Sequence, residues 1–214
     1  PSDSISILYK TFKSNVERQR YKLAKKYANA RTDSARKLVR AEAYPILLNA
    51  LSNDIWPMWY GTTWDYNGYT HKPRNGEIAC GYFVSTTVRD CGFEMNRYDI
   101  AKKYSHSIVK TLCDNDRIQM IRNSDTTQLF NYINSQPNDI YVIGLDNHVG
   151  FMLKTDDGIF FVHSSYYDPN GVARETAQYS EILASSNLFV LGHLATNDDL
   201  LHNWLTKSYV PVIE

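Results

Sequence analysis

The first third of the chain spaces its apolar positions with a helical period. Apolar side chains three and four residues apart predict a helix over residues 4–29, with lysines and arginines on the opposite face. A second helix should begin after Thr32 or Asp33, because either side chain can cap its first turn. Pro45 should kink or restart that helix, because proline cannot donate the interior hydrogen bond. We therefore expect residues 1–54 to form a helical section packed on the rest of the chain.

The second half of the chain changes to the pattern of extended strands. Four β-branched and aromatic runs, separated by short Asp-, Asn- and Gly-containing turns or longer segments, lie at 140–145, 149–154, 159–163 and 188–194. Further helices are predicted at 98–112, 125–136 and 198–207. Helices first and antiparallel strands afterwards is typical of an α+β fold.

A further amphipathic helix is predicted from Tyr82 onward, close to a cysteine in the middle of the chain. An Asn-Gly turn at 75–76 precedes it, and Gly92 stands where a C-terminal glycine stop is expected, so Cys80 falls in the first turn. The positive end of the helix dipole there favours the thiolate and makes the sulfur a nucleophile. The alternative is that Cys80 is a small buried apolar residue, as most free cysteines are. The apolar face comprises Phe83, Val84, Thr87, Val88 and Cys91.

Charge is distributed unevenly along a chain whose net formal charge is zero. Residues 1–50 hold eleven Lys or Arg and four Asp or Glu, a net +7, which the remainder balances at −7. Such a basic arm can bind an anionic surface of lipid, nucleic acid or wall polymer, or lie against its own acidic remainder. Because basic and aromatic residues are not interleaved as in nucleic-acid grooves, we expect no nucleic-acid partner. Contact with its own fold is favoured, and contact with an anionic envelope surface is the alternative.

Three cysteines in 214 residues do not make a disulfide framework, and their spacing matches no zinc motif. No apolar run approaches the roughly twenty residues that span a bilayer, so no transmembrane segment is predicted. The sequence starts at Pro1 and shows no signal peptide, so we expect a trimmed or mature form.

Two histidines lie at the ends of neighbouring predicted strands. His148 opens the second strand and His163 closes the third. Strands joined by a tight hairpin run antiparallel, so these imidazoles should lie within hydrogen-bonding reach. A single strand histidine is commonly structural, but this pair and Cys80 together supply a nucleophile, a base and a group that orients the base.

Four segments, in order, resemble the NlpC-type cell-wall cysteine peptidases of the papain-like superfamily. Gly-Thr-Thr-Trp-Asp-Tyr-Asn-Gly at 61–68 resembles the family's Gly-Thr-Pro-Tyr-x-aromatic-Gly-Gly, and Ala-Cys-Gly-Tyr-Phe-Val at 79–84 its cysteine at a helix start. His-Val-Gly-Phe-Met at 148–152 is similar to its His-Val-Gly-Ile-Tyr strand, and Phe-Val-His-Ser-Ser at 161–165 to its Phe-Ile-His-Ala-Ser ending. The resemblance covers 58–165 and leaves the first fifty residues unexplained.

The resemblance implies a papain-like cysteine hydrolase domain over 55–214. In this thiol protease Cys80 would attack an amide of a peptidoglycan stem peptide, His148 would be the general base and His163 would orient it. The resemblance implies no metal and no organic cofactor, and it names peptidoglycan fragments or peptides as the substrate. It also implies a secreted or periplasmic bacterial protein whose signal sequence has been removed.

The sequence departs from the family at two places. Ala-Cys-Gly-Tyr at 79–82 replaces Asp-Cys-Ser-Gly, so the carboxylate that meets a substrate amine is missing. Trp64 replaces the tyrosine near the oxyanion; its indole N–H can donate, and Tyr66 is the alternative donor. With Asp65 and Gly81 these residues form the expected substrate-binding and oxyanion set. The departures indicate a divergent branch, either an amidase or a peptidase with other substrates.

Two other functions stay open. One is a papain-like module that binds wall polymer without turnover. The other is transglutaminase-like chemistry, which uses an aspartate as the third group; Asp168, in the turn at 168–171, is the candidate. The aromatic segment 55–69 is equally typical of a core-covering loop and of a ligand wall.

Overall fold

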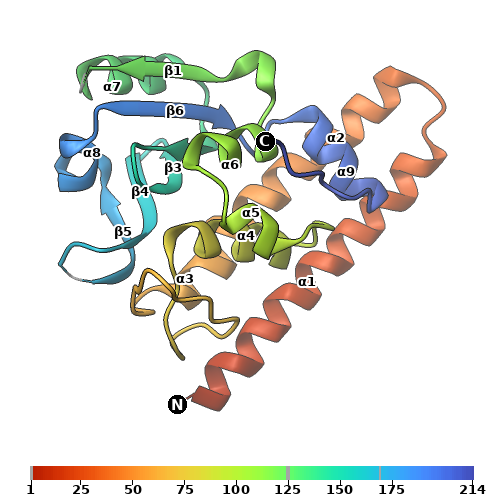
Figure 1. Ribbon diagram of the computed structural model, residues 1–214. Helices are drawn as coiled ribbons and strands as arrows, with labels where there is room; N and C mark the ends of the chain where they lie inside the picture. The colour runs from red at the N-terminus through yellow and green to blue at the C-terminus, as the bar shows by residue number, and fades with distance from the viewer. Residues whose placement is uncertain (1, 124–125, 169) are drawn as a thin grey trace.

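The computed structural model has one antiparallel sheet, whose strands lie on the side of the molecule away from α1 (Figure 1). The structure describes residues 2–123, 126–168 and 170–214, and within them six strands pair in the order β1-β6-β2-β3-β4-β5. All neighbouring strands run antiparallel. The strands are β1 (Gln119–Arg122), β2 (Asp139–Gly144), β3 (Val149–Thr155), β4 (Gly158–Ser165), β5 (Gly171–Thr176) and β6 (Leu188–His193). The expected α+β class is thereby confirmed.

Helices cover both faces of this sheet. On one face α4 and α6 share the main hydrophobic core with the sheet, and on the other α7 and α8 close a smaller core. The α-helices are α1 (Ser2–Asn29), α2 (Asp33–Asn49), α3 (Trp56–Trp59), α4 (Cys80–Asp90), α5 (Arg97–Ala101), α6 (Ser105–Leu112), α7 (Thr126–Ser135), α8 (Glu181–Ser185) and α9 (Asp198–Thr206). A π-helical segment, η1 (Ala50–Ile55), and two 3-10 turns, η2 (Asn115–Arg117) and η3 (Ala177–Tyr179), complete the assignment. Within the same ranges, no helix is both long and apolar enough to cross a membrane.

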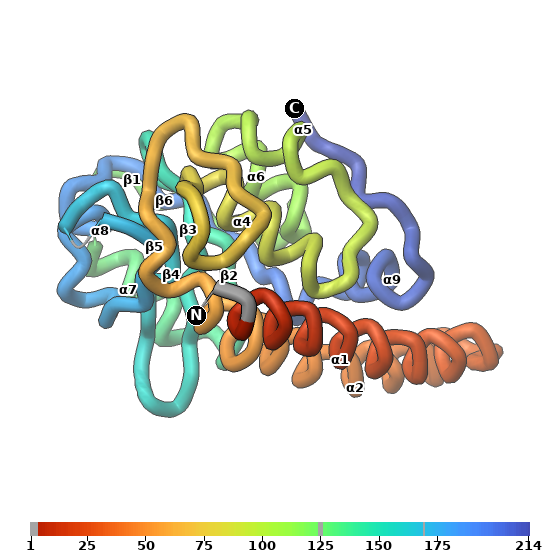
Figure 2. The backbone as a smooth tube through the Cα atoms, turned by 90° about the horizontal axis from the view of Figure 1, so that it is seen from below, coloured from red at the N-terminus to blue at the C-terminus, as the bar shows by residue number. Residues whose placement is uncertain are grey.

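The first two helices form a hairpin along one side of the molecule (Figure 2). The helix predicted over residues 4–29 is confirmed as α1. The restart expected at Pro45 does not occur, because α2 runs through this residue and changes to η1 only at Ala50. Pro45 has no N–H to donate to the carbonyl of Ala41, four residues earlier in the helix. Both residues are exposed, so water can hydrogen-bond to this carbonyl oxygen.

The central helix α4 begins at Cys80, two residues before the predicted start at Tyr82, so Cys80 lies in the first turn as expected. Gly92 follows the helix with a φ of +100°. Its inward face packs on β3, where the rings of Phe83 and Phe151 meet edge to face at 6.0 Å. The single helix predicted over 98–112 is wrong, since α5 and α6 are separate. The end of α5 packs so closely on α4 that a Cβ on Gly81 would lie 2.4 Å from the Ala101 carbonyl oxygen.

The strand predictions match β2, β3, β4 and β6 closely, and α9 matches the predicted last helix. The helix predicted from Asp125 is present from Thr126 onward, and Asp125 itself lies outside the described residues. Of the strands and α-helices in the described ranges, β1, β5, α3 and α8 were not predicted. Of these, β5 carries Glu175, whose carboxylate lies 3.1 Å from His163 Nε2.

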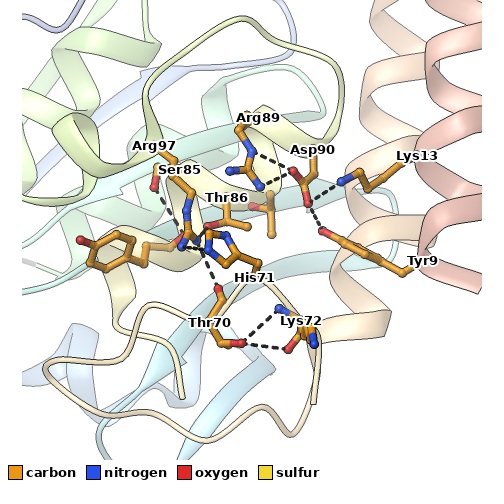
Figure 3. A network of polar contacts seen from close by, with 12 residues as sticks. Tyr9, Lys13, Thr70, His71, Lys72, Ser85, Thr86, Arg89, Asp90 and Arg97 are labelled. Carbon is orange, nitrogen blue, oxygen red and sulfur yellow. Dashed lines mark hydrogen bonds and ion pairs between the residues drawn. The ribbon is translucent and has the colours of Figure 1, made fainter. Parts of the chain in front are cut away.

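A buried carboxylate fastens the end of α4 to α1 (Figure 3). Asp90 is 6% exposed and accepts hydrogen bonds from the Tyr9 hydroxyl at 2.8 Å and from the Arg89 guanidinium at 2.7 and 2.9 Å. Its second oxygen also pairs with Lys13 at 3.3 Å. Burial, followed by the charge of Asp90, raises the pKa of Tyr9 well above its usual value.

A buried guanidinium fastens the middle of α4 to a loop (Figure 3). Arg97 of α5 is 1% exposed and donates to the Thr86 hydroxyl and to the carbonyls of Tyr69 and Thr70. Together with Asp90, this contact fixes α4 along its length. The position of Cys80 at the start of α4 is therefore set by a rigid helix.

Candidate functional site

Cys80 is the first residue of α4, where a helix leaves its backbone N–H groups without intrahelical partners. Ala79 occupies the N-cap position and has no side-chain oxygen to accept from these groups. The start of α4 therefore presents backbone donors beside a thiol. Such donors can stabilise an oxyanion that develops during acyl transfer.

The chain that enters α4 is held between the 61–68 segment and the sheet. The N–H of Ala79 donates to the carbonyl of Gly68 at 2.8 Å, and the Ser164 hydroxyl of β4 donates to the carbonyl of Ile78 at 2.7 Å. Gly68 has to be small here, because a Cβ would lie 2.6 Å from the Glu77 carbonyl carbon. These contacts fix Cys80 relative to β4, the strand that carries His163.

The structure brings the two histidines together, as hairpin geometry predicts. His148 Nε2 and His163 Nδ1 are 2.9 Å apart, and the two rings are nearly perpendicular at 89°. Both side chains are buried, with exposed fractions of 2% and 1%. His163 also stacks on the Phe161 ring, with a centroid distance of 4.0 Å. The pair is therefore rigidly packed at one end of the β3–β4 hairpin.

A glycine on β3 makes room for this packing. Gly150 follows His148 by two residues and is aligned with the end of β4 that carries His163. A Cβ at Gly150 would lie 2.7 Å from Phe161 Cε2 and 2.8 Å from His163 Cβ. Any larger residue at position 150 would have to push the imidazole away.

Glu175 of β5 completes a chain of three groups. Its Oε1 lies 3.1 Å from His163 Nε2. Because a carboxylate only accepts, Nε2 of His163 carries the proton and its Nδ1 accepts from the Nε2–H of His148. Nδ1 of His148 is then left as an unprotonated nitrogen, and it is buried with no hydrogen-bond partner among the described residues. The chain of contacts thus prepares a base at this atom.

Burial sets the charge state of both imidazoles. It lowers the pKa of His148 well below the usual 6.5, and the neighbouring His163 lowers it further. Burial also lowers the pKa of His163, although the hydrogen bond and charge of Glu175 act against this. Both rings are therefore neutral at pH 7, which leaves Nδ1 of His148 free to take a proton.

The expectation that the helix start favours a Cys80 thiolate is wrong for the resting protein. Burial raises the pKa of the Cys80 thiol, although backbone N–H groups of Val149, Gly81 and Cys80 itself act in the opposite direction. Desolvation of the sulfur outweighs the helix start here. All three cysteines are free thiols, and Cys80 is partly exposed whereas Cys91 and Cys113 are buried.

The thiol and the imidazoles occupy neighbouring positions. The Val149 N–H that bonds the Cys80 sulfur belongs to the residue that follows His148. Tyr166 lies beside both groups: its ring centroid is 5.3 Å from that of His148, and burial, Tyr167 and the Cys80 sulfur raise its pKa. In the described part of the chain, no hydrogen bond joins the sulfur to either imidazole.

The expected oxyanion set is only partly beside Cys80. The Trp64 ring lies against Tyr166 at 5.7 Å, and Gly81 contributes its N–H to the sulfur. Tyr66 is 80% exposed, and Asp65 accepts from the N–H of Asn67 and so closes its own turn. Trp64 is therefore better placed than Tyr66 to contact a bound substrate.

A pocket of about 170 Å³ opens next to His163 and Glu175. Asp168, Tyr179 and Glu181 also line it. It is Glu175, not Asp168, that hydrogen-bonds His163, so the carboxylate of the site comes from β5.

Two residues of the site were missed from the sequence. Tyr166 directly follows the Ser-Ser ending of β4, and an aromatic residue just after a strand-end histidine was a usable signal. Glu175 gives a weaker signal, because its place opposite β4 depends on the register in which β5 pairs with β4, and the sequence does not specify that register.

Among the residues that the structure describes, no group of three or more His, Cys, Asp or Glu side chains is arranged to hold a metal ion. Comparison of the chain with protein-family models, with curated proteins and with solved structures finds no match, so the resemblance to NlpC-type peptidases stays a prediction.

Proposed function

We propose that the protein is a cysteine hydrolase that cleaves amide bonds through a thioester acyl-enzyme. Cys80 is the nucleophile, His148 the general base and His163 the group that orients it. The observation that carries the proposal is the buried Nδ1 of His148, which has no hydrogen-bond partner among the described residues. It lies next to the residue whose N–H bonds the Cys80 sulfur. An unsatisfied buried polar atom costs about 1–3 kcal/mol. Among the described residues Trp56 Nε1, the Tyr60 hydroxyl and Arg97 Nε are unsatisfied too, but only Nδ1 of His148 is a nitrogen with a free lone pair that can take a proton.

In the proposed reaction, Nδ1 of His148 takes the thiol proton of Cys80 as the sulfur attacks the substrate carbonyl carbon. The N–H groups at the start of α4 bind the oxyanion. The imidazolium then gives its proton to the departing amine, the C–N bond breaks and a thioester remains. Water, deprotonated by the same nitrogen, attacks the thioester, releases a carboxylic acid and restores the thiol.

The residues behind His148 make its protonation possible in a buried place. The Nε2–H of His148 donates to His163, which keeps Nδ1 as the reactive nitrogen. Glu175 in turn accepts from His163, and its negative charge compensates the imidazolium that forms. Glu175 is therefore a positioning residue in this proposal.

The substrate class rests on the four segments that resemble NlpC-type peptidases. They support a papain-like scaffold, a bacterial envelope location and an amide of a peptidoglycan stem peptide as the bond cleaved. Ala79 offers no carboxylate to a free substrate amine. A stem-peptide amide without an adjacent free amine is therefore the preferred substrate.

The test is mass spectrometry of muropeptides after incubation with the wild type, Cys80→Ala and His148→Ala. Each substitution should lower the cleavage rate by roughly a thousandfold or more, since each removes a member of one catalytic unit. Cys91→Ala is the matched control and should cleave at the wild-type rate, because Cys91 is buried at the other end of α4. Undiminished cleavage by either variant of the site would refute the assignment.

One observation favours a second candidate, a papain-like wall-binding module without turnover. The Cys80 thiol has a raised pKa and, over the part of the chain that the structure describes, no hydrogen bond to an imidazole, as an inert cysteine would. Iodoacetamide labelling separates the two candidates. If His148 deprotonates the thiol, His148→Ala slows the labelling of Cys80 about tenfold at neutral pH. An unchanged labelling rate supports the inert module.

A further inference from the structure

The connected ends of α1 and α2 carry much of the uncompensated positive charge of the chain. Residues 18–40 hold nine Lys or Arg and one Asp. Three of the nine are paired within the protein: Arg20 with Glu17, Lys26 with Glu42 and Arg40 with Asp198. The other six are exposed and have no carboxylate partner in the described ranges; this basic tip comprises Arg18, Lys22, Lys25, Arg31, Arg36 and Lys37.

The basic tip faces solvent because the buried faces of both helices point elsewhere. On α1, Leu23 and Tyr27 are buried, whereas Lys22 and Lys25 fall on the opposite side. Figure 2 shows the connected ends of the two helices reaching past the rest of the chain. A flat surface can therefore approach these cations without meeting the sheet.

Two large apolar side chains lie among the cations. Leu38, next to Lys37 on α2, is 69% exposed, and Tyr21 on α1 is 54% exposed. Lys25 Nζ lies 4.5 Å from the centroid of the Tyr21 ring. Exposed apolar groups surrounded by Lys and Arg are typical of helices that lie in the headgroup region of a bilayer.

We propose that the basic tip docks on an anionic phospholipid surface, with Leu38 and Tyr21 entering the headgroup region and the six cations meeting lipid phosphates. The charge of the chain supports this orientation, because residues 51–214 carry a net −7 and are repelled by such a surface. The proposal does not depend on the hydrolase function.

A nucleic acid fits the basic tip less well. Single strands are bound by stacking bases on free aromatic faces, and Lys25 already covers one face of Tyr21. The tip is also a protruding hairpin end, whereas electrostatic binding of a strand uses a groove that follows its backbone. A lipid surface needs no groove.

The test is co-sedimentation of the full chain with phosphatidylcholine vesicles, with and without phosphatidylglycerol. Binding should require phosphatidylglycerol and weaken as salt is added, because surface charges are screened. The triple variant Lys22→Gln, Lys25→Gln, Lys37→Gln should lower the partition coefficient roughly a hundredfold.

A second triple variant, Lys72→Gln, Lys102→Gln, Lys110→Gln, is the matched control, because it changes the net charge equally outside the basic tip. It should bind as the wild type does. Leu38→Ser should weaken binding several-fold, and Ile7→Ser, at a residue 66% exposed near the start of α1, should not.

Three results would overturn the proposal: equal binding to both vesicle types, equal losses in the two triple variants, or tighter binding to duplex DNA than to anionic vesicles at the same salt concentration.

Discussion

The two buried histidines make the stability of the fold depend on pH. Burial lowers the pKa of His148 well below 6.5, so the unfolded chain takes up a proton at a pH where the folded protein does not. The contribution of the neutral His148 to the free energy of unfolding is constant well above pH 6.5. It is lost as the pH falls from 6.5 toward the pKa of His148 in the folded protein. For this one group the loss in the free energy of unfolding rises to at most about 1.4 kcal/mol per pH unit, the value reached once the unfolded imidazole is fully protonated.

Other shifted groups can be separated from this effect. His163 acts in the same direction, but Glu175 reduces its shift. The pKa values of Glu17 and Glu175 are lowered from 4.5, so these carboxylates act only at lower pH. The window between pH 5.5 and 6.5 therefore reports on the histidines.

Urea unfolding at several pH values, on the wild type and His148→Gln, measures the contribution. Between pH 6.5 and 5.5 the wild type should lose about 1 kcal/mol more than the variant, because the unfolded imidazole is only half protonated at pH 6.5. Asn147→Gln changes the exposed neighbouring residue without removing a titrating group and should match the wild type. Parallel pH profiles for wild type and His148→Gln would contradict the assignment of His148 as a buried neutral imidazole.

Three further predictions concern the packing around the site. Gly150→Ala should destabilise the fold by about 1–3 kcal/mol in urea unfolding, because its Cβ would lie 2.8 Å from His163 Cβ; a loss below about 0.5 kcal/mol would argue against that contact. Asp90→Ala should lower the free energy of unfolding by about 2 kcal/mol, since it leaves Tyr9 and Arg89 without their acceptor. Asp157→Ala, at an exposed residue, should leave the free energy of unfolding almost unchanged. Equal losses in the two variants would contradict the role of Asp90 as a buried acceptor. Glu175→Gln should lower the pKa of His163 further in an NMR titration, because the carboxylate raises it. An unchanged or higher pKa would contradict the assignment of the His163 proton to Nε2.

The sequence was informative wherever a local pattern decides the structure. The helix start at Cys80 depends on apolar spacing and a nearby turn, and both are visible without coordinates. The meeting of His148 and His163 depends only on a tight hairpin, whose antiparallel geometry is general. These predictions needed no knowledge of distant contacts.

Features that depend on tertiary context could not be predicted in the same way. Burial, which raises the pKa of Cys80, opposes the effect of the helix start, and no pattern near the cysteine indicates how much surface covers it. The continuation of α2 through Pro45 depends on that side of the helix being exposed. Apolar and polar residues alternate only weakly along β5, and the strand carries charged residues, so Glu175 was assigned to no strand.

The central claim is that Cys80 forms a covalent acyl intermediate. Its most direct test is mass spectrometry of the intact protein and of its peptic peptides, after the wild type is mixed with muropeptides and quenched in acid. An added acyl mass is expected on the Cys80 peptide; neutral hydroxylamine should remove it, and Cys80→Ala should lack it. Turnover of muropeptides with no such adduct, or an adduct on Cys91 or Cys113, would contradict it.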